Sequence, residues 1–247
     1  GYKGEYIKKY MVDYAALETD LTVSMRDGRV ERHATSTSHQ PDWTVDLVDT
    51  TNLDQLASAF KPNTKLLWLE SPGNPLLSIT DIARCAEIAH QHQVLVGVDS
   101  TFATPVLTRP LELCADIVMH SATKYIGGHS DVLGGVLVAK DRPLFDRLYY
   151  TQNATGGVMA PLEAYLCSRG SKTLDLRVRE HCRTAQRIAE WLLTQANVSR
   201  VLYPGLPDHP GHEIARRQMD GGFGAMITFE IKGDFKAAQK FAESTKL

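Results

Sequence analysis

Three polar residues with useful chemistry stand directly after strand-like apolar runs of this sequence. Lys124 follows "DIVMHSAT", Asp99 ends "VLVGVD", and Asn74 follows "KLLWLE" after a short turn. In open α/β sheets, ligands bind beyond the carboxyl ends of the strands. We therefore expect an amine, a carboxylate and an amide to share one edge of a sheet, although 25 positions separate each of them from the next.

The environment of Lys124 allows two interpretations. Lysine is almost never fully buried without a partner, so Lys124 lies either on a solvated turn or at a site where its amine has a function. A bare carboxylate at the end of an apolar run, as at Asp99, is costly unless a cationic group compensates it. Ser121 and Thr123 flank the lysine with hydroxyl groups that can bind a phosphate.

A lysine, an acid and phosphate-binding donors are the groups that pyridoxal phosphate needs from a protein. The amine of Lys124 suits the aldehyde, and the carboxylate of Asp99 can keep the pyridine nitrogen protonated. A protonated ring withdraws the electrons that remain when the substrate Cα loses its proton. The less specific alternatives are a strand-end cap for Asp99, a turn residue for Asn74 and plain turn hydroxyls for Ser121 and Thr123.

Other ligand classes find little support in the same region. His120 and His129 have no carboxylate or cysteine at ligand spacing, so we expect no metal site. The nearby glycines form neither of the common nucleotide-binding motifs.

The elements around these residues alternate between strand and helix. We predict strands over 45–51, 65–71, 94–100, 116–121 and 135–140, and helices over 52–60 (capped by Asn52 or Asp54) and 80–93 (capped by Thr80). The strands are nearly continuous apolar runs, which is typical of strands that are covered on both faces. The alternation predicts an α/β fold with a mainly parallel sheet flanked by helices.

The last third of the chain has a different character. Residues 172–196 have the spacing of a long amphipathic helix, a break rich in proline and glycine follows, and 225–233 reads as one half-buried strand before a helix that begins near Asp234. A single strand leaves unpaired edges, so we expect something to complete it. We predict an atypical N-terminal segment (1–43), an α/β domain (44–196) and the start of a smaller C-terminal α+β domain (197–247).

Composition limits the class of protein. The 247 residues carry a formal charge of −2, which provides no general basic field for nucleic acid or an anionic membrane. No apolar run approaches the roughly 18 residues that span a bilayer, and the first residues lack the apolar core of a secretory signal. The four cysteines form no C-x-x-C pair, which favours buried free thiols. We expect a cytoplasmic protein without nucleic-acid or membrane partners.

A longer motif makes the chemistry more specific. "DIVMHSATKYIGGHSDVLGG" (116–135) resembles the lysine signature of the trans-sulfuration family of pyridoxal-phosphate enzymes. "TKLLWLESPGNP", "VDSTFATPVLTRPLELCADI", "APLEAYLCSRGSKTLDLRV" and "VLYPGLPDHPGHEIARRQ" also resemble that family, in the same order, so the likeness covers about residues 44–247. It implies the fold of the type I pyridoxal-phosphate transferases.

The resemblance also implies a role for each candidate residue. Lys124 would hold the cofactor covalently and move protons during the reaction, as the catalytic residue. Asp99 would pair with the pyridinium nitrogen, and Asn74 would lie near the ring hydroxyl. Ser121 and Thr123 would bind the phosphate.

"YPGLPDHPGHEIARRQM" and "KTLDLRVREH" look most like the cystathionine γ-lyase and γ-synthase branch. The implied reaction is γ-elimination of cystathionine to cysteine, 2-oxobutanoate and ammonia. One alternative is γ-replacement of the synthase type. Another is a catalytically weak relative that acts as an interaction subunit, because 1–43 lacks the family's Tyr-Ser-Arg stretch. The family further implies a homodimer or homotetramer with its site at the dimer interface.

Overall fold

The computed structural model describes residues 20–23, 30–33, 50 and 52–245. The chain divides into two compact units, Gly1–Asp49 and Thr50–Leu247. In the first unit, β1 (Asp20–Val23) pairs with β2 (Val30–His33) in antiparallel register. The strand predicted over 45–51 lies outside the described residues except for Thr50, which is in a turn. The boundaries predicted at 43/44 and 196/197 stay predictions.

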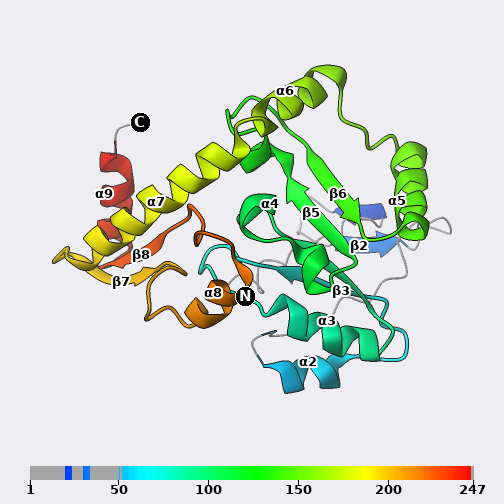
Figure 1. The fold of residues 1–247 in the computed structure, drawn as a ribbon, viewed down its shortest axis with the longest axis horizontal. Helices are drawn as coiled ribbons and strands as arrows, with labels where there is room; N and C mark the ends of the chain where they lie inside the picture. Colours follow the sequence, from blue (N-terminus) through cyan, green and yellow to red (C-terminus); the bar gives the residue numbers. More distant parts are fainter. Residues whose placement is uncertain (1–19, 24–29, 34–49, 51, 246–247) are drawn as a thin grey trace. The chain divides into compact units, whose positions relative to one another are not determined.

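The second unit is built around one four-stranded sheet. Its strands, in spatial order, are β3 (Leu66–Glu70), β4 (Leu95–Asp99), β5 (Ile117–Ser121) and β6 (Gly135–Ala139). The first three run parallel to one another, and β6 returns antiparallel to β5 (Figure 1). The predicted α/β fold with a mainly parallel sheet is confirmed.

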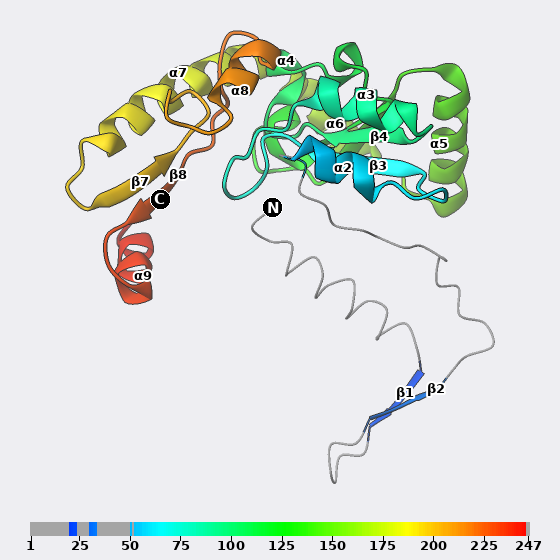
Figure 2. The same cartoon turned by 90° about the horizontal axis from the view of Figure 1, so that it is seen from below.

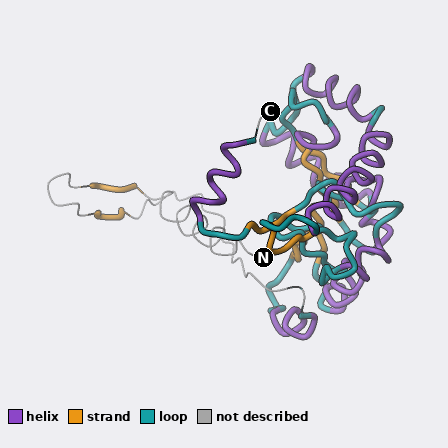
Figure 3. The backbone as a smooth tube through the Cα atoms, turned by 90° about the vertical axis from the view of Figure 1, so that its left-hand side faces the viewer, coloured by secondary structure: helices purple, strands orange, loops and turns teal. Residues whose placement is uncertain are grey.

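Figure 3 shows helices lying around the strands of the second unit. They are α2 (Leu53–Ala59), α3 (Ile82–Gln91), α4 (Thr104–Leu107), α5 (Arg142–Thr155), α6 (Pro161–Ser171), α7 (Leu174–Leu193), α8 (His212–Gln218) and α9 (Phe235–Ser244). The long helix predicted over 172–196 is α7. The helix predicted to begin near Asp234 is α9, whereas the sequence pattern predicted none of α4, α5, α6 and α8.

The core shows which strands are covered. Side chains from α2 and α3 pack on β3 and β4, with Leu56, Leu69, Ile82, Val96 and Val98 all nearly inaccessible to solvent. At the two edges the prediction of coverage on both faces is wrong, because Trp68 on β3 is 46% exposed and Leu137 on β6 is 52% exposed. An edge strand has a neighbour on one side only, so its apolar pattern alone does not reveal how much of it is buried.

The helix caps follow from local chemistry. Asn52 caps α2 by accepting a hydrogen bond from the backbone N–H of Gln55, as predicted. The cap predicted for the next helix is wrong by one residue, because Asp81 rather than Thr80 accepts the N–H of Arg84 at 3.3 Å. Thr80 lies one position earlier, where its own N–H donates to the hydroxyl of Ser71.

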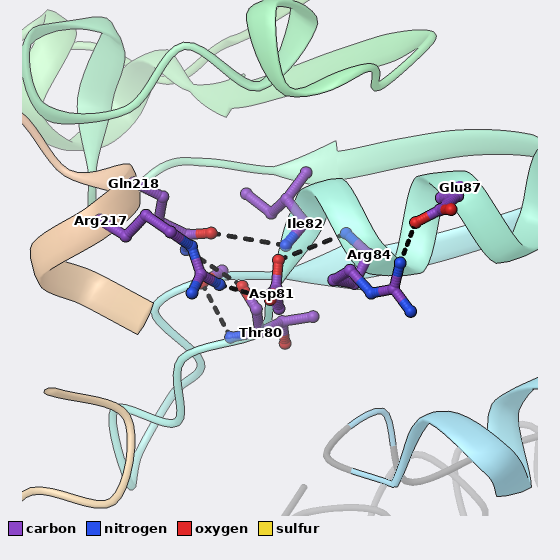
Figure 4. Close-up of polar contacts among 8 residues, drawn as sticks. Thr80, Asp81, Ile82, Arg84, Glu87, Arg217 and Gln218 are labelled. Atoms are coloured by element: carbon purple, nitrogen blue, oxygen red, sulfur yellow. Dashed lines mark hydrogen bonds and ion pairs between the residues drawn. The ribbon is translucent and has the colours of Figure 1, made fainter. Parts of the chain in front are cut away.

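The start of α3 is also joined to α8 (Figure 4). Arg217 forms an ion pair with the carboxylate of Asp81 at 2.5 Å. Gln218 donates its amide hydrogen to the carbonyl of Thr80 at 3.0 Å and accepts the N–H of Ile82 at 3.4 Å. Gln218 of α8 thus satisfies one backbone N–H that the N-terminus of α3 leaves unpaired, and Arg217 binds the capping carboxylate itself.

Replacing Asp81 with alanine should lower the free energy of unfolding by about 1–2 kcal/mol, because it removes both the cap and the ion pair. Replacing Arg217 with alanine should cost less than about 1 kcal/mol, since the arginine side chain is 62% exposed. Urea denaturation of the two variants checks this order. A larger cost for the arginine variant would show that the ion pair, not the cap, holds the junction.

The C-terminal part contains a strand pair that the sequence did not reveal. β8 (Thr228–Ile231) pairs antiparallel with β7 (Val198–Leu202), which lies beside α7 (Figure 2). The prediction of a single strand is therefore wrong. "VSRVL" alternates too weakly and is too short for periodicity to separate it from the preceding helix.

Two further expectations can be compared with the structure. Cys85, Cys167 and Cys182 are buried free thiols, whereas Cys114 is exposed, at a residue with a φ of 67°. Within the described part of the chain, no helix is both long and apolar enough to cross a membrane.

Candidate functional site

Asp99 stands at the carboxyl end of β4, half-buried, and hydrogen bonds tie it to the neighbouring strand. Its Oδ1 accepts the N–H of Thr101 at 3.0 Å, and the hydroxyl of Thr101 accepts the N–H of Ser121 at 2.8 Å. The N–H of Ser100 donates to the carbonyl of Met119 at 3.0 Å. These bonds keep Asp99 and Ser121 together at one edge of the sheet.

Lys124 lies in a π-helical turn (Ala122–Ile126) that begins where β5 ends. The N–H of Ala122 donates to the carbonyl of Gly134 at 2.9 Å, and the carbonyl of Lys124 accepts the N–H of Gly128 at 2.8 Å. The lysine side chain is exposed, and among the described residues its amine has no partner. Hydrogen bonds therefore fix the backbone on both sides of Lys124. No described residue occupies its amine, which can bind a ligand.

Thr123 is already engaged within the protein. Its hydroxyl oxygen accepts the N–H of Gly134 at 3.0 Å and donates toward the carbonyl of the same residue at 3.3 Å. A hydroxyl has one hydrogen to donate, so this side chain holds the lysine turn against the start of β6. Ser121 differs, because its hydroxyl has no partner among the described residues.

Asn74 joins the site through its backbone. Its N–H donates to the Glu70 carboxylate at 3.2 Å, and Glu70 lies opposite Asp99 in the strand register. Partial burial and the Asp99 charge raise the pKa of Glu70, against the opposing effect of the hydrogen bond from Asn74. The amide side chain of Asn74 is exposed and contacts none of the other predicted site residues.

His120 also lies at this edge. On sequence grounds His120 is considered only as a metal ligand, and no metal is expected there. Its ring is 6% exposed, and its Nδ1 lies 3.1 Å from the carbonyl oxygen of Ser100. Burial lowers the pKa of His120, although the bond to Ser100 and the charge of Asp99 act in the opposite direction. The neutral ring then donates from Nδ1. The hydroxyl of Ser100 is buried without a partner among the described residues.

The buried histidines predict a pH dependence of stability. Burial also lowers the pKa of His209, whose ring Nδ1 accepts the N–H of Gly211 at 3.0 Å. Because the unfolded chain takes up protons near pH 6.5 while the folded ring stays neutral, the unfolding free energy should fall as the pH drops below about 6.5. The slope should approach about 1.4 kcal/mol per pH unit for each histidine.

Urea denaturation between pH 7.5 and 5.5 measures this slope. Replacing His120 with glutamine should reduce the slope, because it removes one of the two buried rings. A stability that is constant over this range would contradict the assignment of neutral, buried rings.

Three polar groups at this edge have unused capacity within the described residues: the Lys124 amine, the second carboxylate oxygen of Asp99 and the Ser121 hydroxyl. Pyridoxal phosphate has three matching polar ends, which are an aldehyde, a ring nitrogen and a phosphate. The residues present therefore fit this cofactor. Thr123 fits less directly, because its hydroxyl is already bonded to Gly134.

Comparison with known proteins agrees with this chemistry. A cystathionine γ-synthase of Mycobacterium tuberculosis is 50% identical over 196 residues, which are 79% of this chain and 50% of the relative. A cystathionine β-lyase of Lactococcus lactis subsp. cremoris is 50% identical over 81% of this chain and 52% of its own length. The chain thus spans about half the length of the curated relatives it matches.

Solved structures give the same picture. A cystathionine γ-lyase from Lactobacillus plantarum, complexed with L-serine, superimposes with a TM-score of 0.74 at 48% identity, over 76% of this chain and 49% of that one. The family model for Cys/Met metabolism PLP-dependent enzymes matches residues 23–247, and so begins about 20 residues before the region in which the resemblance was seen. This chain belongs to the family of pyridoxal-phosphate-dependent enzymes of cysteine and methionine metabolism.

Proposed function

We propose that this chain binds pyridoxal phosphate through Lys124 and cleaves the Cγ–S bond of cystathionine. The observation that carries the proposal is one sheet edge with three polar groups that have no partner among the described residues: the amine of Lys124, the second carboxylate oxygen of Asp99 and the hydroxyl of Ser121. Each matches one polar end of the cofactor on which the family depends.

Each of the site residues would have a different role in the reaction. The Lys124 amine would attach the cofactor and afterwards carry protons to and from the substrate carbons. Asp99, fixed by the Thr101 N–H, would keep a proton on the ring nitrogen. The Ser121 hydroxyl would donate to the phosphate, while Thr123 holds the turn. When bound, pyridoxal phosphate supplies an electron sink for the negative charge that develops on the substrate.

The reaction proposed is γ-elimination, in which cystathionine and water give cysteine, 2-oxobutanoate and ammonia. The second candidate is γ-replacement, and it is favoured by the identity of 50% with a cystathionine γ-synthase. The likeness to a β-lyase at the same identity adds β-elimination, in which cystathionine and water would give homocysteine, pyruvate and ammonia.

Product analysis separates these reactions. The chain, supplied with pyridoxal phosphate and cystathionine, should release 2-oxobutanoate, which chromatography distinguishes from pyruvate. Pyruvate would assign β-elimination, and turnover only with an activated homoserine and cysteine would assign γ-replacement. A chain that binds the cofactor but produces none of these would favour the catalytically weak relative.

We also propose that the chain forms a homodimer or homotetramer in the cytoplasm. Several large apolar side chains of α5, α6 and the link between them are exposed: Tyr149 (58%), Tyr150 (74%), Val158 (64%), Leu162 (65%) and Tyr165 (62%). Large apolar side chains exposed on neighbouring elements often mark protein interfaces when they are contiguous. Sedimentation equilibrium should give a dimer or larger species, and a monomer at micromolar concentration would contradict the proposal.

A further inference from the structure

Arg177, near the start of α7, reaches from the helix to the turn that carries Lys124. Its Nη1 donates to the carbonyl of Tyr125 at 2.8 Å, and its Nη2 donates to the carbonyl of Gly170 at 2.8 Å. Its Nε donates to the hydroxyl of Thr173 at 3.0 Å. One half-buried guanidinium thus joins the residue after Lys124 to the junction between α6 and α7.

The partners of Arg177 are two carbonyl oxygens and a hydroxyl. The ion pairs of the other arginines on α7 differ from this arrangement, since Arg179 pairs with Asp175 and Arg183 with Glu180 on the exposed face. The planar fork of arginine can donate to several acceptors in fixed directions, which a lysine ammonium cannot reproduce. The geometry of Arg177 is therefore that of a clamp on backbone groups.

The backbone around the Lys124 turn is tightly packed against α6 and Arg177, so a shift of Arg177 would move the turn. A Cβ at Gly170 would lie 2.2 Å from the carbonyl oxygen of Gly127. A Cβ at Gly128, whose φ is +75°, would lie 2.3 Å from Nη1 of Arg177. The turn after Lys124 therefore packs directly against α6 and the guanidinium.

The two sides of Lys124 are fixed by different elements. Before it, Ala122 and Thr123 are bonded to Gly134 at the start of β6. After it, the Tyr125 carbonyl is held by Arg177. If the guanidinium fork is lost, the Tyr125 carbonyl loses this hydrogen bond, and among the described residues only packing against α6 and its apolar neighbours remains on that side of the turn.

We infer that Arg177 is a positioning residue for Lys124. It keeps the turn at Ala122–Ile126 in the one arrangement from which the amine meets the cofactor aldehyde. The inference rests on the proposed function and deepens it by naming a residue that acts through the backbone and not by touching the cofactor.

The test compares Arg177→Lys with Arg179→Lys, an exposed arginine on the same helix. Each chain is incubated with pyridoxal phosphate and reduced with borohydride, and mass spectrometry measures the label on Lys124. The Arg177 variant should label about 10-fold or more slowly, or need about 10-fold more pyridoxal phosphate, since the loss of charge-assisted hydrogen bonds is of that order. The Arg179 variant should behave like the unaltered chain.

Hydrogen exchange supplies a readout that needs no cofactor. The amides of Gly127 and Gly128 donate to Ala122 and Lys124 and define the turn, so in the Arg177 variant they should exchange about 10-fold faster. Thr173→Val, which removes one acceptor of the fork and leaves the arginine, should show a smaller effect in the same direction. The Thr173→Val variant also tests the positioning role if Arg177→Lys fails to fold.

The experiment separates the failure of the proposed function from the failure of the positioning role of Arg177. An unaltered chain that never labels at Lys124 overturns the proposed function, and the positioning role with it. An unaltered chain that labels, beside an Arg177 variant with the same labelling and the same exchange at Gly127 and Gly128, overturns the positioning role alone.

Discussion

Replacement of Lys124 with alanine is expected to abolish the covalent attachment of pyridoxal phosphate and to lower turnover by at least about a thousandfold. The lysine amine is the one group proposed both to bond the cofactor aldehyde and to move protons on the substrate. Without it, the cofactor is held only by weaker contacts, such as those proposed for Asp99 and Ser121. Turnover is measured as 2-oxobutanoate release, and attachment by borohydride reduction followed by mass spectrometry.

The same substitution should leave the fold intact. The Lys124 side chain is exposed and has no described partner, so the unfolding free energy should change by no more than about 0.5 kcal/mol. Lys172, an exposed lysine that follows α6, provides the matched control, and its replacement with alanine should change neither labelling nor turnover. Label that persists on the Lys124 variant, at another lysine, would exclude the assignment.

The largest loss of stability is expected from Asp116, at the opposite end of β5 from the candidate site. Its carboxylate is fully buried and accepts hydrogen bonds from Lys140 at 2.5 Å, His90 at 2.9 Å and the N–H of Val96 at 2.7 Å. Alanine at this position should cost about 3 kcal/mol, because the buried N–H and the two side chains lose their acceptor together.

The pH dependence has a definite sign. Burial by itself would raise the pKa of Asp116, but the hydrogen bonds from Lys140, His90 and Val96 outweigh it and hold the pKa below its usual value. A lowered pKa stabilises the folded chain fully above the unfolded value of about 3.9, and this contribution is lost as the pH falls through the folded pKa. Acid unfolding should therefore steepen below about pH 4.

Urea denaturation of Asp116→Ala and Asp116→Asn, at pH 7 and pH 3.5, measures both effects. The asparagine variant should lose the steep acid response while retaining part of the stability, since its amide oxygen still accepts one hydrogen bond. Asp146→Ala is the control, because this carboxylate pairs with Arg142 on the exposed face of α5. Its loss should lower the free energy of unfolding by about 0.5 kcal/mol or less. Equal losses at Asp116 and Asp146 would contradict the buried network.

The sheet and four of the helices (α2, α3, α7 and α9) were predictable because their signals are local. β4 and β5 are continuous apolar runs with a burial pattern to match, and the apolar spacing of α7 brings Val178, Cys182 and Ala185 to one buried face. α5 was missed because Leu144 is its only buried side chain, which leaves no apolar stripe to detect. β7 was missed because its partner, β8, lies about 30 residues further along the chain.

Some features of the candidate site were likewise predictable from the sequence, and others were not. The strand-end positions of Asp99 and Lys124 follow from alternation and from the rule that ligands bind at the carboxyl edge, so the sequence alone pointed to them. The bond from Thr123 to Gly134 was not predictable, because it depends on β6 returning antiparallel to β5. Nor was the burial of His120, which depends on how closely the ends of β4 and β5 approach.

From the sequence by itself came the fold class, the family and the residue types at the sheet edge, because each of these depends on short-range pattern or on a contiguous motif. Only the tertiary structure decided which of those side chains are already occupied and which are free. It also revealed that Arg177, about 50 residues after Lys124, holds the lysine turn in place. Hydrogen bonds between distant segments depend on how the backbone packs, and spacing along the chain does not encode that packing.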